Sequence, residues 1–158
     1  MTKTLFKLMT VAVLSTAIFS CEKGENTDPT NDSQSNEGRV YILNEGVWGG
    51  NDAELSRYSD IDNSIANDYF ASKNGRGLGD VANDIEIYGG KMYVVVNCSN
   101  TVEVIDSKTG NSIQQIPLSG KQPREVAFYE GYAYVSCYDK TIVKIDTATL
   151  SIVAQCQT

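Results

Sequence analysis

The stretch KMYVVVNCSNTVEVID, residues 91–106, joins two runs of strand-forming residues through a polar corner. The segment YAYVSCYDKTIVKID, residues 132–146, repeats it, and Tyr134 takes the place of Tyr93. No apolar pattern of helical period persists between residue 38 and the end of the sequence, which favours an all-β fold. A period of about forty residues with four strands in each unit is typical of β-propeller blades. The sequence therefore predicts a β-propeller of four-stranded antiparallel blades.

The repeats divide the chain into blade pieces at about 39–70, 81–117 and 123–157. Two pieces hold four expected strands each, at 83–88, 91–97, 101–106 and 112–117, then at 125–128, 132–138, 141–146 and 151–156. Asp106 and Asp146 follow the third strand of these pieces, where a carboxylate accepts hydrogen bonds from nearby backbone N–H groups. We interpret both aspartates as turn caps and not as catalytic acids.

The first blade piece has no first strand of its own. Its expected strands are 39–44, 53–59 and 64–72, so the chain carries about two and three-quarter blades, an incomplete propeller. Bare blade faces expose apolar surface and unpaired strand edges. We therefore expect an N-terminal fragment of a longer propeller, marginally stable or prone to aggregate by itself. The alternative is that several copies assemble into a closed ring.

The N-terminal region has the pattern of an exported, anchored protein. Residues 1–20 combine two lysines with a short apolar run, as in a secretory signal peptide, and Cys21 follows. The ending IFSC, residues 18–21, resembles the lipobox of bacterial lipoproteins, which implies acylation of Cys21. The rest of 21–38 lacks aliphatic and aromatic side chains and predicts a flexible linker. We expect a lipid-anchored protein at the outer membrane or cell surface; the alternative is an ordinary signal peptide.

Composition argues against several classes of function. The formal charge is −7 and the cations are not clustered, which disfavours nucleic-acid binding. The absence of histidine removes the commonest general base and metal ligand. Cys98, Cys137 and Cys156 do not have metal-site spacing; we expect small unpaired strand residues, with a disulfide between two of them as the alternative. We expect no catalytic residues, metal or cofactor, and an enzyme is the least favoured class.

A ligand-binding face is better supported, because the loops at one edge of successive propeller blades converge around the central channel. The longest of them, residues 44–53, carries Trp48, the single tryptophan, beside two glycines. Trp48 alternatively packs against the neighbouring blade, and Asn44 and Asn97 alternatively satisfy their own turns. The candidate ligand-binding residues are Asn44, Glu45, Trp48, Asn51, Arg76, Asn97, Gln122, Arg124 and Tyr138.

Two resemblances add to this reading. Residues 93–97 and 99–106, with the Thr109-Gly110 turn, Gly120 and Pro123, resemble the YVTN repeat of bacterial surface β-propellers. The opening ILNEGVWGGNDAELSRYS, residues 42–59, together with the lipobox, is similar to Bacteroidetes-type surface lipoproteins that work beside TonB-dependent outer-membrane transporters. The best understood of these capture cobalamin, which implies a nutrient-capturing protein with a corrinoid as the leading ligand. The alternative is a structural or adhesion propeller that binds a protein or glycan partner.

Overall fold

The structure is a computed structural model that describes residues 39–158. The predictions made for residues 1–38, namely the signal peptide, the acylated Cys21 and the polar linker, lie outside the described residues. Within 39–158, the helix that forms is six residues long, so this part of the chain contains no helix able to cross a membrane.

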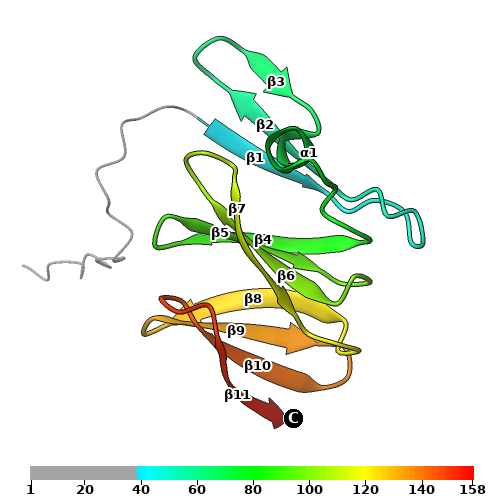
Figure 1. The fold of residues 1–158 in the computed structure, drawn as a ribbon, viewed down its shortest axis with the longest axis vertical. Helices are drawn as coiled ribbons and strands as arrows, with labels where there is room; N and C mark the ends of the chain where they lie inside the picture. Colours follow the sequence, from blue (N-terminus) through cyan, green and yellow to red (C-terminus); the bar gives the residue numbers. More distant parts are fainter. Residues whose placement is uncertain (1–38) are drawn as a thin grey trace, which may run out of the picture.

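Three antiparallel sheets lie one after another along the chain, and in each sheet the strands pair in sequence order. Figure 1 shows these sheets stacked face to face along the long axis. We call them blades 1, 2 and 3. The strands are β1 Arg39–Asn44, β2 Glu54–Ser59 and β3 Ser64–Ala66 in blade 1; β4 Ala82–Tyr88, β5 Lys91–Val96, β6 Thr101–Asp106 and β7 Ser112–Pro117 in blade 2; and β8 Pro123–Tyr129, β9 Tyr132–Cys137, β10 Thr141–Asp146 and β11 Ile152–Gln157 in blade 3. The prediction of an all-β, incomplete propeller is confirmed.

The turns of blades 2 and 3 repeat in atomic detail. Asp106 Oδ1 accepts hydrogen bonds from the N–H groups of Lys108 and Thr109 at 3.0 and 2.7 Å. Asp146 Oδ1 accepts the equivalent pair, from Ala148 and Thr149, at 2.9 and 2.8 Å. In both cases the hydrogen bond from the threonine backbone is the main cause that lowers the aspartate pKa. Both residues are turn caps, as predicted.

Two apolar cores hold the blades together, one on each side of blade 2. Successive side chains of a strand point to opposite faces, so β5 contributes to both. Met92, Val94 and Val96 pack toward blade 1, whereas Tyr93 and Val95 pack toward blade 3. Near the second core Phe128 of blade 3 stacks on Tyr88, with ring centroids 4.6 Å apart. The two faces of blade 2 thus contribute side chains to two different cores.

The prediction of a strand at residues 64–72 in blade 1 is correct for its first residues and wrong for the rest. β3 ends at Ala66, and helix α1, Tyr69–Asn74, follows it. The helix is bounded by left-handed residues, Asp68 before it and Gly75 after it. Its Tyr69 and Phe70 are buried in the core between blades 1 and 2. Two adjacent buried aromatic residues suit a helix that lies against a blade face, because neighbouring positions on a strand would face opposite sides.

The blades are also joined by side chains that bind the backbone of the next blade. Tyr41 donates its hydroxyl to Ser107 O at 2.6 Å, and Lys91 Nζ donates to Thr147 O at 3.1 Å. Asp84 Oδ2 accepts from the N–H of Val126 at 2.8 Å. These ties fix how each blade sits on its neighbour, and with it the spacing of their loops.

Candidate functional site

Loops from all three blades lie along one edge of the stack. They are the β1–β2 loop, the β5–β6 and β9–β10 turns, and the connections that enter β4 and β8. Backbone hydrogen bonds hold them together in pairs: Ala82 donates to Glu45 O at 3.0 Å, and Tyr138 donates to Gln122 O at 2.9 Å. We call this edge the loop face; its β1–β2 loop projects beyond the blades in Figure 1.

The β1–β2 loop is closed by the side chain of Asp52. The Asp52 Oδ1 atom accepts from the N–H of Val47 at 2.8 Å, and Gly50 donates to Val47 O at 2.7 Å. A Cβ at Gly46 or Gly50 would lie 2.7 or 2.6 Å from Asp52 Oδ1. These glycines therefore make room for the carboxylate, so any larger residue there would open the loop.

A second aspartate ties this loop to the connection between blades 1 and 2. Both carboxylate oxygens of Asp80 accept from the N–H of Gly49, at 3.1 and 3.0 Å. Asp80 is held in turn by Ser99, whose hydroxyl accepts from the Asp80 N–H at 2.8 Å. The loop tip is thus fixed from blade 1 by Asp52 and from blade 2 through Asp80.

Trp48 stands at this fixed tip and is 82% exposed. It therefore does not pack against blade 2, the neighbouring blade within residues 39–158. It lies beside the thiol of Cys98, in the β5–β6 turn. Burial is the main cause that raises the pKa of Cys98, and the negative charge of Asp80 adds to it. The thiol therefore stays protonated at neutral pH, and most of the indole surface faces solvent.

Glu45 and Asn83 form a polar pair beside the loop. Asn83 Nδ2 donates to Glu45 Oε1 at 2.8 Å. Asn83 Oδ1 is buried and has no hydrogen-bond partner among residues 39–158. The pair joins the β1–β2 loop to the start of β4. Asn44 and Asn51 are exposed in the same part of the chain.

Asn97 contacts both the next blade and its own turn. It is 8% exposed, and its Nδ2 donates to Pro123 O of blade 3 at 2.8 Å. Its Oδ1 also accepts from the thiol of Cys98, in the same turn, at 3.4 Å. The side chain therefore joins two blades and also contributes to its own turn, which is the alternative given in the sequence analysis.

Gln122 and Arg124 lie at the entry to β8 and are both exposed, and Tyr138 is 72% exposed. The blade 3 side of the loop face thus contributes its own exposed aromatic ring.

Arg76, another candidate ligand-binding residue, does not join the residues of the loop face. Its Nη2 atom lies 2.8 Å from Glu103 Oε1, and its guanidinium stacks on the ring of Phe70 at 5.0 Å. Glu103 is fully buried on β6 and also accepts from Ser112 and Gln115. Arg76 therefore neutralises a buried carboxylate in the interface of blades 1 and 2.

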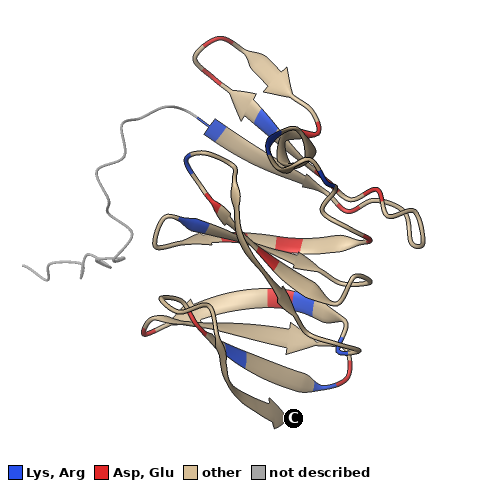
Figure 2. Cartoon of the chain, viewed as in Figure 1, with Lys and Arg blue, Asp and Glu red and all other residues tan. Residues whose placement is uncertain are grey.

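Sequence reasoning missed Asp80, Asn83 and Cys98 as members of the loop face. Cys98 lies in a turn, whereas Cys137 and Cys156 lie on strands as expected; all three thiols are free. Across 39–158, no group of three or more acidic, cysteine or histidine side chains is placed to hold a metal ion. Lysine, arginine and acidic residues are interspersed over the three blades (Figure 2).

The comparisons with known proteins agree on this architecture. Residues 38–157 match the model of a family described as Domain of unknown function (DUF5074), and the chain belongs to that family. No curated protein matches.

Solved structures that resemble the chain show the fold. Hydrazine synthase of Kuenenia stuttgartiensis is 18% identical over 66% of this chain and 30% of its own, with a TM-score of 0.54. The dihydro-heme d1 dehydrogenase NirN, in complex with DHE, is 14% identical over 76% and 28%, with a TM-score of 0.58. AztD from Citrobacter koseri, in its apo form, is 14% identical over 77% and 32%, with a TM-score of 0.53. The chain spans less than a third of each of these proteins.

Proposed function

We propose that this protein is a lipid-anchored surface protein that uses its loop face to capture a nutrient for a TonB-dependent outer-membrane transporter. The single observation that carries the binding role is Trp48, 82% exposed on a loop whose backbone is fixed by Asp52 and Asp80. A rigid loop loses little conformational entropy when a ligand docks, so its exposed ring contributes affinity at low cost.

The aromatic and amide groups of this face support a large ligand that carries both apolar and amide surface. The indole of Trp48 offers a flat apolar face, and the exposed side chains of Asn44, Asn51 and Gln122 offer amide donors and acceptors. Tyr138, on blade 3, adds a second exposed ring. A corrinoid, whose ring bears several amide arms, is the leading ligand because of the resemblance of residues 42–59 to cobalamin-capturing lipoproteins. The anchor at Cys21 and the transporter partner belong to the same proposal.

The binding role is tested by calorimetric titration of the full chain with cyanocobalamin, since corrinoids absorb light and would confuse a fluorescence readout. We expect saturable binding that the Trp48→Ala variant weakens at least tenfold. Tyr129→Ala is the matched control, because Tyr129 is 64% exposed at the end of β8, opposite the loop face. Equal binding by both variants would remove Trp48 from the site.

An adhesion role is the second candidate, favoured by Val47, which is 68% exposed beside Trp48 and adds apolar surface suited to a protein partner. Absence of corrinoid binding, together with loss of surface attachment in cells that express Trp48→Ala, would favour that role. The anchor is checked separately: Cys21→Ala should release the protein from the membrane fraction, and an unchanged distribution would contradict acylation at Cys21.

A further inference from the structure

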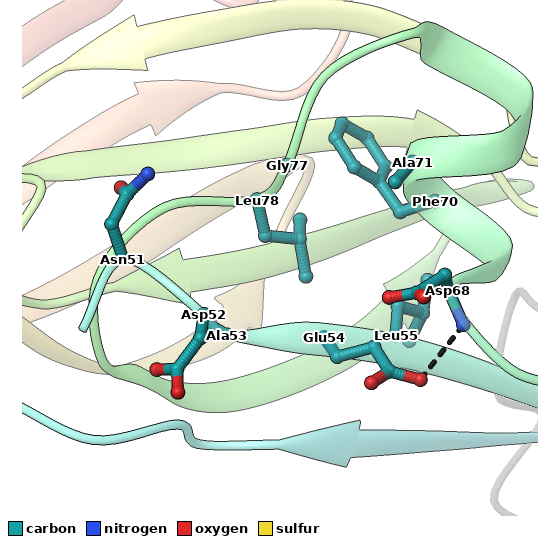
Figure 3. A pocket seen from close by; sticks show the side chains of 10 residues that line it. All are labelled: Asn51, Asp52, Ala53, Glu54, Leu55, Asp68, Phe70, Ala71, Gly77 and Leu78. Atoms are coloured by element: carbon teal, nitrogen blue, oxygen red, sulfur yellow. Dashed lines mark hydrogen bonds between the residues drawn. The ribbon is translucent and has the colours of Figure 1, made fainter.

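Two arginines in the interface of blades 1 and 2 stack on neighbouring aromatic rings of α1. The Cζ atom of Arg76 lies 5.0 Å from the centre of the Phe70 ring. The Cζ atom of Arg57, on β2, lies 4.9 Å from the centre of the Tyr69 ring. Figure 3 shows the Phe70 ring between α1 and the segment with Gly77, the residue that follows Arg76. Two consecutive residues of α1 thus hold two guanidinium groups in the same way.

The two guanidinium groups differ in their hydrogen-bond partners. Arg76 Nη2 donates to Glu103 Oε1 at 2.8 Å and to Ser112 Oγ at 3.1 Å. Arg57 forms no hydrogen bond or ion pair with any residue of 39–158, and its Nε atom is buried. A guanidinium group that has lost part of its water needs an acceptor or an anion in its place. Within 39–158, Arg57 lacks the anionic acceptor that Glu103 provides for Arg76.

An ion from solvent can reach Arg57, because its side chain is partly exposed. Arg57 pairs with Tyr41 across β1 and β2, near the end of β2 that lies away from the loop face. The hydroxyl groups of Tyr41 and Tyr69 already donate to main-chain oxygens of blade 2, at 2.6 and 3.0 Å. A ligand bound to Arg57 therefore leaves these ties between the blades intact.

Other cations lie close to Arg57. Lys73 of α1 is exposed, and its Nζ atom lies 5.7 Å from the centre of the same Tyr69 ring. Arg39 lies on the same face of β1 as Tyr41, because the two residues are two positions apart. Burial raises the pKa of Tyr41, and the charges of Arg39 and Arg57 both oppose this rise. The surroundings of Arg57 are thus positively charged.

The acidic residues of the nearby turns do not pair with Arg57. Asp62 Oδ1 accepts from the N–H and the hydroxyl of Ser64, at 3.1 and 2.8 Å, within its own turn. Asp106 caps the β6–β7 turn, as described above. Asp60 is exposed in the β2–β3 turn and forms no ion pair with Arg57 either. The charge of Arg57 is therefore left for an anion from outside residues 39–158.

We propose that Arg57 binds a phosphate group, with Lys73 and Arg39 adding positive charge beside it. A planar guanidinium group presents paired N–H donors that match two oxygens of a phosphate, and such charge-assisted hydrogen bonds are among the strong ones in proteins. A phosphate monoester or free phosphate carries up to two negative charges, which suits a site with more than one cation.

The same chemistry has two sources, a free phosphate or monoester and the phosphodiester head group of an anionic lipid. The site lies away from the loop face and is independent of the nutrient proposed there.

The test follows the arginine side-chain resonances of the full chain by nuclear magnetic resonance while inorganic phosphate is added at constant ionic strength. We expect the Arg57 resonances to shift saturably and those of Arg124, exposed on blade 3, to change much less. A second titration uses glycerophosphoglycerol, the soluble head group of an anionic lipid. Tighter binding of inorganic phosphate identifies a free phosphate or monoester as the ligand; tighter binding of glycerophosphoglycerol identifies a lipid head group. No saturable shift of Arg57 with either compound, or equal shifts of Arg57 and Arg124, would overturn the proposal.

Two variants locate the site. Arg57→Lys keeps the charge but loses the paired donors, so we expect the affinity for phosphate to fall several-fold. Lys73→Gln removes an exposed charge beside the site and should also weaken binding. Lys140→Gln, exposed in the β9–β10 turn of blade 3, is the matched control and should bind like the wild type. Equal losses in Lys73→Gln and Lys140→Gln would indicate general charge attraction and would contradict the site. The resonances of the wild-type chain decide the matter even where Arg57→Lys folds poorly.

Discussion

The ring of Tyr69 occupies the space next to Gly110, so that a Cβ at position 110 would lie 2.5 Å from Tyr69 Cε1. The Tyr69 hydroxyl also donates to Thr109 O at 3.0 Å. In the next repeat the equivalent position is Leu150, with φ of 57°, and its buried side chain belongs to the core between blades 2 and 3. The Tyr69 ring therefore fills the core between blades 1 and 2 beside Gly110, and the Leu150 side chain fills the equivalent place between blades 2 and 3.

The first prediction concerns this contact. Gly110→Ala should lower the free energy of unfolding by about 1–3 kcal/mol, because it combines a clash in a packed core with a left-handed backbone. Denaturant unfolding measures the change. In a Tyr69→Ala background the clash is gone, so only the backbone cost of about 1 kcal/mol should remain. An equal cost in both backgrounds would show that Tyr69 is not the cause.

The second prediction concerns the buried carboxylate of Glu103. Arg76→Ala leaves this carboxylate without its cation, and we expect a loss of about 1–3 kcal/mol in the free energy of unfolding. The lower part of this range allows for the 41% exposure of the Arg76 side chain. Lys121→Ala is the control, because its pair with Asp139 at 3.5 Å is partly exposed and worth about 0–1 kcal/mol. Equal effects of the two variants would contradict the structural role of Arg76.

The third prediction concerns the fixed loop. Asp80→Ala removes the two acceptors of the Gly49 N–H, so the amide of Gly49 should exchange with solvent markedly faster while the melting temperature changes little. Hydrogen exchange followed by nuclear magnetic resonance measures this directly. Asp60→Ala, which lies outside the loop face, should leave the exchange of Gly49 as it is. Slow exchange retained in Asp80→Ala would mean that Asp52 alone orders the loop tip.

The fourth prediction is a dependence of stability on pH. Hydrogen bonds from Thr109 and Thr149 lower the pKa of Asp106 and Asp146 below the ordinary value of 3.8. The folded state therefore binds protons less readily than the unfolded state, and stability present above pH 3.8 is lost as the pH falls through the folded pKa. Melting temperatures of the wild type should drop between pH 5 and about pH 2.

The variant Asp146→Asn keeps a capping oxygen but does not titrate, so its melting temperature should fall less steeply over this range. The same slope in the variant and the wild type would show that other carboxylates control the acid sensitivity.

The repeat in the sequence was sufficient to predict the strands of blades 2 and 3 and the turn caps. Both depend on local signals: alternating side chains, and an aspartate two or three residues before the N–H groups it accepts. Helix α1 could not be predicted, since six residues hold too little periodicity, and its form is decided by the burial of Tyr69 and Phe70 between two blades.

The candidate site was predicted less completely, because its contacts join residues far apart in the chain. Nothing near Gly49 indicates that Asp80 would hold it, and nothing near Arg76 indicates Glu103. Asn97 ends a strand-like run, as do many turn residues, and only the packing of blade 3 turns its amide toward Pro123. The Trp48 loop itself was found, because its length and its single tryptophan are local features.

The ties between blades have a bearing on how such a chain grows during evolution. Tyr41, Lys91 and Asp84 all reach main-chain atoms of the following blade, at Ser107, Thr147 and Val126. Main-chain atoms are present whatever the local side chain is. A duplicated blade could therefore make the same hydrogen bonds to whichever blade follows it. Its loops could then change in sequence without compensating mutations in the neighbouring blade.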